Sequence, residues 1–198
     1  MRQRHLLSCS SDAQITPVVR TILASWGIFL VYWLLAARNA QRTVARENLA
    51  TRLPHLILVT LGFFLIFVPG AGSDVCCLPR WIGVLGLGAF AGGLAIAVWA
   101  RRHLGRYWSG AIARKEGQRI VRTGPYRLVR HPIYTGLLVA VLGSALVLGN
   151  LRGFLALLCI TLAYALKIRR EEQFLMTEFG DDYRRYRAEV KALIPFVA

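Results

Sequence analysis

The sequence predicts an all-α fold: an integral membrane bundle of about five transmembrane helices with an interfacial site on the cytoplasmic side. Three observations lead to this fold class. The 198-residue chain is 56% hydrophobic and only 18% charged, whereas an average soluble domain is about 25% charged. Its apolar residues form long blocks, and crossing a bilayer takes about 20 such residues. Its 25 lysines and arginines outnumber 10 acidic residues and lie mostly between those blocks.

This composition excludes several classes of protein. An intrinsically disordered chain is excluded because disorder requires low hydrophobicity. The long apolar blocks argue against a nucleic-acid partner despite the basic charge. Four cysteines in 198 residues are too few for a disulfide framework. Cys76 and Cys77 fall in a predicted outer loop, as either a strained vicinal disulfide or two free thiols.

Five apolar blocks predict the transmembrane helices. The first resembles a signal peptide, but it is too long for the hydrophobic region of one and no clear cleavage site follows. The last two are joined by Gly149-Asn150-Leu151, and this break with turn-forming residues predicts a tight helical hairpin. The blocks are residues 17–37, 55–72, 82–100, 133–149 and 152–168.

Small residues are concentrated in the third block. Gly88 and Gly92 are four residues apart, as are Ala89 and Gly93. This spacing lets helices approach closely in lipid. We expect packing within the bundle, and a contact between two copies of the chain is the alternative. The oligomeric state stays open.

The basic residues predict the topology. The loops 38–54 and 101–132, and the segment from Lys167 onward, hold 4, 9 and 7 lysines and arginines, or 20 of the 25. The positive-inside rule places these segments in the cytoplasm. We therefore expect a multi-pass membrane protein with its N-terminus outside and its C-terminus inside.

Polar side chains concentrate at two places on that cytoplasmic side, one just before the fourth block and one at the end of the fifth. From Pro132 the chain rises by about 26 Å at about 1.5 Å per residue, turns near Asn150, and returns the same distance. If the two helices are adjacent, the two places meet at one depth. The side chains expected to face one another there are Arg130, His131, Tyr134, Glu171 and Glu172.

The start of the fourth block suits an anionic ligand. Pro132 fits the first position of a helix, where its missing N–H costs nothing. The first turn then offers free backbone N–H groups and the positive end of the helix dipole, which favour a carboxylate. Gly136 would let a ligand or a neighbouring helix approach the backbone closely.

Each of these features also has an ordinary interpretation. Arg130 and His131 before a span suit a positive-inside anchor, and Glu171 and Glu172 could pair with basic residues on the surface. Tyr126 could be an interfacial aromatic residue. No metal site is expected. The histidines that lack partners at metal-ligand spacing, and are expected to be bystanders, are His5, His55 and His103.

Three stretches occur in an order and at a spacing that together are more specific for a protein family than any one stretch alone. They are Leu104-Gly105 with Trp108-Ser109; Gly124-Pro125-Tyr126-Arg127 through Arg130-His131-Pro132-x-Tyr134-x-Gly136; and Glu171-Glu172 followed by Phe179-Gly180-Asp181-Asp182-Tyr183-x-x-Tyr186 and Ile194-Pro195-Phe196. Over about 80–197, the chain resembles the isoprenylcysteine carboxyl methyltransferases, membrane enzymes within a wider group that includes phospholipid N-methyltransferases. Its short length resembles a prokaryotic member, which implies a location in the inner cell membrane.

The resemblance implies S-adenosylmethionine as the methyl donor, bound at the cytoplasmic face of the membrane. Arg130 and Glu171 would be catalytic, with Arg130 pairing to a carboxylate of the cofactor or the substrate. Tyr183 and Tyr186 would help to cover the site. The residues implied to line the cofactor pocket are His131, Tyr134, Gly136, Glu171, Glu172 and Tyr126.

The resemblance also implies a division of the chain. Residues 1–80, an N-terminal tail and two transmembrane helices, would lie on the substrate side. Residues 81–198 would form the methyltransferase core, with three transmembrane helices and a cytoplasmic C-terminal helix. The substrate would be a lipid-like or prenylated small molecule that arrives from the membrane lipids, since an apolar acceptor partitions into the bilayer.

The expected reaction is carboxyl O-methylation of an isoprenylcysteine-like acceptor. The eukaryotic enzymes usually carry Val-Pro-Thr-Gly before the final Ile-Pro, whereas residues 190–193 here read Val-Lys-Ala-Leu. Methylation of a phospholipid or a small amine at nitrogen is therefore an alternative. A second is an NADPH-dependent membrane reductase, because some sterol reductases have a similar Arg-His-Pro-x-Tyr-x-Gly element. A membrane scaffold without enzymatic activity is a third.

Overall fold

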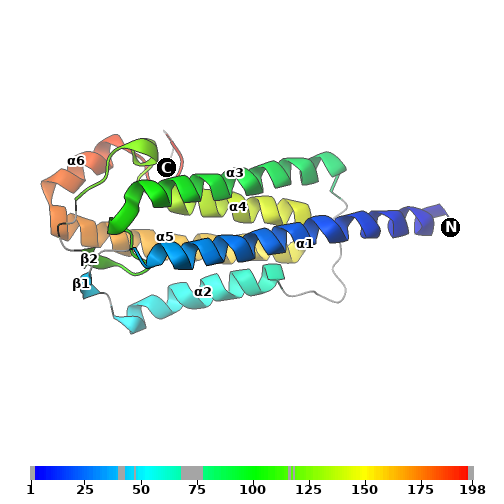
Figure 1. The fold of residues 1–198 in the computed structure, drawn as a ribbon, viewed down its shortest axis with the longest axis horizontal. Coiled ribbons are helices and arrows are strands. Elements are labelled where there is room, and N and C mark those ends of the chain that lie inside the picture. Colours follow the sequence, from blue (N-terminus) through cyan, green and yellow to red (C-terminus); the bar gives the residue numbers. More distant parts are fainter. Residues whose placement is uncertain are drawn as a thin grey trace. The chain divides into compact units, whose positions relative to one another are not determined.

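The computed structural model describes residues 3–39, 43–46, 48–67, 78–115, 117 and 119–195. Within these ranges the chain is mostly α-helical, which confirms the predicted fold class (Figure 1). The α-helices are α1 Gln3–Ala37, α2 Leu49–Phe67, α3 Arg80–Leu104, α4 Pro132–Leu148, α5 Leu151–Phe179 and α6 Asp181–Glu189. The short elements are the antiparallel strands β1 Thr43–Arg46 and β2 Ala113–Lys115 and the 3-10 helices η1 Gly105–Tyr107 and η2 Gly124–Arg127.

The chain divides into two compact units, Met1–Ala36 and Ala37–Ala198. The first consists of most of α1, and the second contains all the predicted site residues. The proposed functional division between residues 1–80 and 81–198 concerns substrate and catalysis, and it stays a prediction.

Four helices among the described residues are long and apolar enough to cross a membrane, and α4 is a shorter apolar helix. Together they match the five predicted blocks, so the chain is a multi-pass membrane protein. The bounds differ most at three helices. Helix α1 begins at Gln3 rather than at residue 17. Pro54 lies inside α2 rather than before it. Helix α5 continues past the predicted end at 168 to Phe179, because no helix-breaking residue occurs before Gly180, whose φ is 51°.

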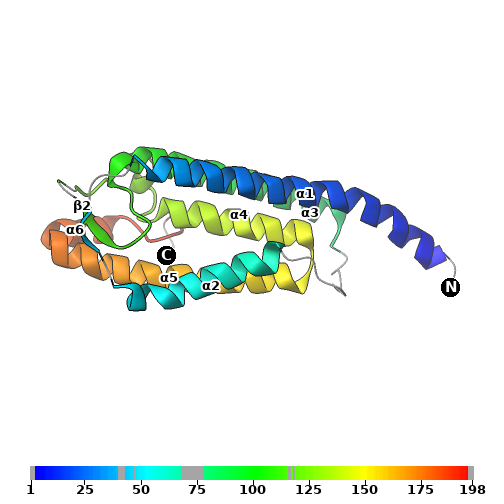
Figure 2. The same cartoon turned by 60° about the horizontal axis from the view of Figure 1, so that its bottom comes forward.

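Helices α4 and α5 form the predicted hairpin, and Figure 2 shows them running back along each other. Gly149 ends α4 in the left-handed conformation, with φ 59°. The side chain of Asn150 accepts a hydrogen bond from the N–H of Gly153 at 2.9 Å and so caps α5. This turn returns the chain to the end of the bundle at which α4 begins.

Helices α3 and α4 approach each other backbone to backbone. A Cβ added at Gly93 would collide with the α4 backbone at Ala140, and one at Gly136 would collide with the α3 backbone. The packing within the bundle is therefore as predicted for Gly93. The other predicted pair, Gly88 and Gly92, does not face α4, because a Cβ added at either residue would meet nothing within 4 Å. Gly136 was predicted to allow close approach of a ligand or of a neighbouring helix, and in the structure the backbone of α3 lies against it.

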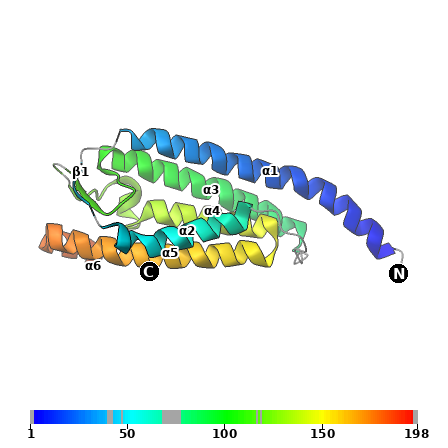
Figure 3. The same ribbon diagram turned by 90° about the horizontal axis from the view of Figure 1, so that it is seen from below.

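Helix α2 packs along α5, as Figure 3 shows. His55 Nδ1 lies 3.1 Å from the carbonyl oxygen of Ala163, so this predicted bystander links the two helices. An added Cβ at Gly62 would collide with Ile160 of α5. Cys76 and Cys77, and the end of the second predicted block, lie outside the described residues.

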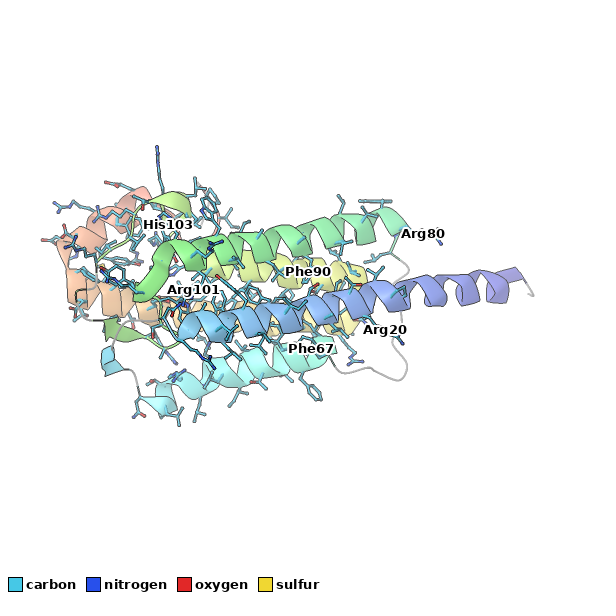
Figure 4. The ribbon with its side chains drawn as sticks, in the orientation of Figure 1. Arg20, Phe67, Arg80, Phe90, Arg101 and His103 are labelled. Carbon is cyan, nitrogen blue, oxygen red and sulfur yellow. The ribbon has the colours of Figure 1, made fainter. Side chains whose placement is uncertain are left out.

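Helix α3 has basic residues at both ends of an apolar stretch. Figure 4 shows Arg80 at one end and Arg101 and His103 at the other. The second end lies beside the loop that leads to α4, because His103 and Ala100 contact Thr123 and Tyr126 of that loop.

Candidate active site

Glu172, near the end of α5, is the centre of a charged cluster formed with the buried Arg130 and His131 and with Arg187, whose side chain is 54% exposed. Arg130 Nε donates to Glu172 Oε1 at 2.8 Å, and Nη2 lies 2.7 Å from the same oxygen. His131 Nε2 lies 3.1 Å from it, and Arg187 Nε lies 3.4 Å from Oε2. The side chains of Arg130 and Glu172 are only 8% and 10% exposed. Because water cannot solvate these charges well, each depends on its partner.

Glu171 has a different partner. Tyr134 Oη donates to Glu171 Oε2 at 2.8 Å. The ring of Tyr134 stacks between those of His131 and Tyr164, at centroid distances of 5.6 and 4.8 Å. Lys167 Nζ lies 5.6 Å from the centroid of the Tyr134 ring. Consecutive helical residues point about 100° apart, so the two neighbouring glutamates serve two distinct groups of side chains.

Tyr126, on η2, connects the loop before α4 to two helices. Its hydroxyl lies 3.5 Å from the carbonyl oxygen of Ala100 at the end of α3. Its own carbonyl oxygen accepts a hydrogen bond from Tyr186 Oη of α6 at 2.6 Å. Tyr126 is therefore a buried junction at the edge of the charged cluster, rather than an aromatic residue at a lipid interface.

His103, expected to be a bystander, positions this loop. Its Nε2 lies 2.8 Å from Thr123 Oγ1, and its ring stacks on that of Tyr126 at a centroid distance of 6.4 Å. Gly124 follows with φ 58°, and a Cβ there would collide with the imidazole of His103. Glycine is needed at this position both for the backbone conformation and for the contact.

The phenols around the cluster are hydrogen-bond donors rather than bases. Burial raises the pKa of Tyr183 well above its ordinary value, and the Glu172 carboxylate raises it further. Burial also raises the pKa of Tyr126, and it raises that of Tyr186 to about 12. Tyr183 is only 2% exposed, and its hydroxyl has no hydrogen-bond partner within the described ranges.

The structure brings together the five side chains that were predicted to meet. They are joined by ion pairs, hydrogen bonds and ring stacking, and they are not the exposed pairs of an ordinary surface. Tyr126 lies close enough for the Glu171 carboxylate to raise the pKa of its phenol. Gly136 contacts α3 instead, so its predicted place in the cofactor pocket stays a prediction.

The guanidinium of Arg130 is fully engaged by the protein. Besides binding Glu172, it donates through Nη1 to the carbonyl oxygens of Arg187, at 3.2 Å, and Val190. The N–H of His131, just before α4, donates to the carbonyl oxygen of Ala192 at 3.0 Å. Binding a ligand carboxylate, the role predicted for Arg130, would therefore require it to exchange partners.

Sequence reasoning missed two arginines. Arg187 is a further cation on Glu172, and nothing in its sequence context distinguishes it from Arg184 and Arg185, which are also exposed on this helix and pair with Asp181 and Asp182. Arg101 is buried at the end of α3, where it donates to the carbonyl oxygen of Gly105 at 2.8 Å and lies 4.3 Å from the centroid of the Trp108 ring. Gly105 and Trp108, the two partners of Arg101, belong to the Leu104-Gly105 and Trp108-Ser109 pairs noted in the sequence.

The side chains fit a ligand that carries both a cation and hydrogen-bond acceptors. A carboxylate stabilises a cation such as a sulfonium, and Glu171 provides one that is held in place by the hydroxyl of Tyr134. The neutral, unsatisfied hydroxyl of Tyr183 can donate to a carboxylate or a ring nitrogen. In the part of the chain that the structure describes, no group of three or more His, Cys, Asp and Glu residues is placed to hold a metal ion.

Comparisons with known proteins agree with this chemistry. Residues 81–182 match the family described as phospholipid methyltransferase. The chain is 35% identical over 91 residues to the protein-S-isoprenylcysteine O-methyltransferase of Schizosaccharomyces pombe, covering 44% of this chain and 37% of the relative. It is 31% identical over 136 residues to protein-S-isoprenylcysteine O-methyltransferase B of Arabidopsis thaliana, covering 67% of this chain and 66% of the relative.

The fold is also similar to a solved structure, that of the eukaryotic intramembrane Ras methyltransferase ICMT (isoprenylcysteine carboxyl methyltransferase). The TM-score is 0.52 at 19% sequence identity, over 78% of this chain and 55% of the other. This chain thus spans between about a third and two thirds of the length of these three proteins.

Proposed function

This chain belongs to the phospholipid methyltransferase family, and from that premise we propose that it transfers a methyl group from S-adenosylmethionine to a lipid-like acceptor at the membrane surface. The observation that carries the proposal is the convergence of Glu171, Glu172, Tyr134 and His131 where the α4–α5 hairpin begins and ends. The excess of basic residues in the loops on that side supports a cytoplasmic location for the site, in an inner cell membrane.

S-adenosylmethionine, when bound, supplies an electrophilic methyl group on a sulfonium cation. Glu171, oriented by the hydroxyl of Tyr134, would hold this cation, and the hydroxyl of Tyr183 would donate to an acceptor atom of the cofactor. Tyr126 and Tyr186, joined by a hydrogen bond, would keep water out from the side of α6. These groups position and desolvate the reactants, and alignment alone can contribute as much as about 7–11 kcal/mol to catalysis.

The acceptor that we propose is the carboxylate of an isoprenylcysteine-like molecule. A carboxylate is ionised at neutral pH, because its reference pKa is about 4, and it needs no general base. The similarity to isoprenylcysteine O-methyltransferases supports this acceptor. An amine acceptor, such as the amine of a phospholipid headgroup, would need a proton acceptor, and Glu171 is a carboxylate placed to serve.

Labelled S-adenosylmethionine tests the proposal directly. The purified protein in detergent is incubated with it and with either prenylcysteine analogues or a membrane lipid extract. A base-labile product is an ester and supports the carboxylate acceptor, whereas a base-stable product indicates an amine. Absence of transfer to both acceptors, together with no thermal stabilisation by millimolar S-adenosylmethionine, would falsify the proposed function.

Variants test the site. We expect Arg130→Ala, His131→Ala and Glu171→Ala each to slow methyl transfer at least about tenfold, which corresponds to about 1.4 kcal/mol in the activation barrier. Arg185→Ala is the matched control, because the Arg185 side chain is 70% exposed and pairs with Asp182 on the same helix. Full activity in all three site variants would end the assignment.

A further inference from the structure

The segment that follows α6 lies against the start of α4. We call residues 190–195 the strap. Val129 and Lys191 form a parallel bridge, and neighbouring groups of the α4 side donate to main-chain carbonyl oxygens of the strap. These bonds are Arg130 N–H to Lys191 at 2.8 Å, His131 N–H to Ala192 at 3.0 Å, and Thr135 Oγ1 to Leu193 at 2.8 Å.

One side chain joins the strap to α5. Arg130 places Nη1 on the carbonyl oxygens of Arg187 and Val190, at the junction between α6 and the strap. It places Nε and Nη2 on the carboxylate of Glu172. The side chain of Arg187 returns to the other oxygen of that carboxylate. The buried carboxylate of Glu172 therefore fixes the guanidinium of Arg130, and this guanidinium in turn binds the strap.

These contacts use the backbone of the strap and not its side chains. They therefore do not depend on which residues occupy 190–193, and the departure of this stretch from the usual Val-Pro-Thr-Gly does not remove them. The contacts made by the Arg130 guanidinium do depend on the charge of Glu172, because this carboxylate lies 2.7 Å from Nη2 and balances the buried positive charge. The adjacent Glu171 takes no part and is bonded to Tyr134.

We propose that Arg130 and Glu172 are positioning residues that fasten the strap beside the first turn of α4, and that the fastened strap is required for the methyl donor to bind. The second half of this inference rests on the proposed function. It assigns separate tasks to the two neighbouring carboxylates, since Glu172 orders the protein while Glu171 faces the ligand.

Hydrogen exchange of the intact protein without ligand tests the first half. The amides of residues 130 and 131 report docking, because their N–H groups donate to strap carbonyls. We expect Glu172→Gln and Arg130→Ala to exchange these amides at least about tenfold faster, with partial protection in Arg130→Lys. Glu171→Gln and Arg185→Ala should remain within twofold of wild type. Wild-type exchange rates in Glu172→Gln and Arg130→Ala would overturn the fastening role.

Kinetics with labelled S-adenosylmethionine test the second half. We expect Glu172→Gln and Arg130→Lys to raise the KM for S-adenosylmethionine at least fivefold while kcat falls by less than that. A lower kcat with unchanged KM would mean only a loss of folded protein, and it would overturn the requirement for binding. If the wild-type protein transfers no methyl group, the proposed function is wrong, and so is the requirement of the strap for binding of the methyl donor. Hydrogen exchange would still test whether Arg130 and Glu172 fasten the strap.

Discussion

The α3–α4 contact and the charged cluster at the end of the hairpin are both buried, but opposite means hold them together. Along α3 and α4, Gly93 and Gly136 let two backbones touch because neither has a side chain. At the cluster, the long side chains of Arg130 and Glu172 are shielded from water, and each charge is neutralised by the other. The first region depends on shape and the second on charge.

The contrast follows from the surroundings of each region. Lipid tails are as apolar as leucine, so helices within a membrane gain little from hiding apolar surface and associate by close packing. At the end of the bundle, polar groups are available, but burying them is costly unless they are paired. The first region should therefore fail when an atom is added, and the second when a charge is removed.

The largest effect is expected at the cluster. Glu172→Ala leaves the buried guanidinium of Arg130 without its counter-ion, which should reduce the free energy of unfolding by about 3–5 kcal/mol. Glu171→Ala removes one hydrogen bond from Tyr134 and should cost less, about 1.5–3 kcal/mol. Thermal and denaturant unfolding in detergent measure both. Equal losses would contradict the separate tasks of the two glutamates.

An intermediate effect is expected at the glycine contact. In Gly93→Ala the new methyl group collides with the α4 backbone, and such overpacking costs about 1–3 kcal/mol. The neighbouring Gly92→Ala is the matched control. A Cβ there meets nothing within 4 Å, so it should be neutral or gain up to about 1 kcal/mol from the better helix propensity of alanine. Identical unfolding curves for the two variants would mean that α3 and α4 do not touch in this way.

The smallest change in stability, with a separate effect on binding, is expected for Tyr183→Phe. A buried hydroxyl without a partner is unfavourable, so its removal should leave stability unchanged or raise it by up to about 1 kcal/mol. The thermal stabilisation by S-adenosylmethionine should nevertheless decrease, because the ligand loses a donor. Ligand stabilisation equal to that of wild type would show that this hydroxyl does not contact the cofactor.

The predicted and unpredicted parts of the site differ in a physical way. The meeting of His131 and Tyr134 with the two glutamates could be predicted, because two helices joined by a tight turn return the chain to the depth at which the first helix began. The strap could not, since its contacts use main-chain carbonyls and leave no pattern of side chains. The length of α5 was underestimated because hydropathy locates the bilayer and not the end of a helix.

The sequence by itself determined that the chain crosses a membrane several times, where it turns, and which polar residues gather at one end, because hydropathy, turn residues and helical rise are local properties. Tertiary structure alone decided that Arg130 binds Glu172 and the strap, that Gly93 rather than Gly92 meets α4, and that His103 supports the loop. These outcomes depend on the rotation of each helix about its axis and on partners distant in the chain, which no local pattern encodes.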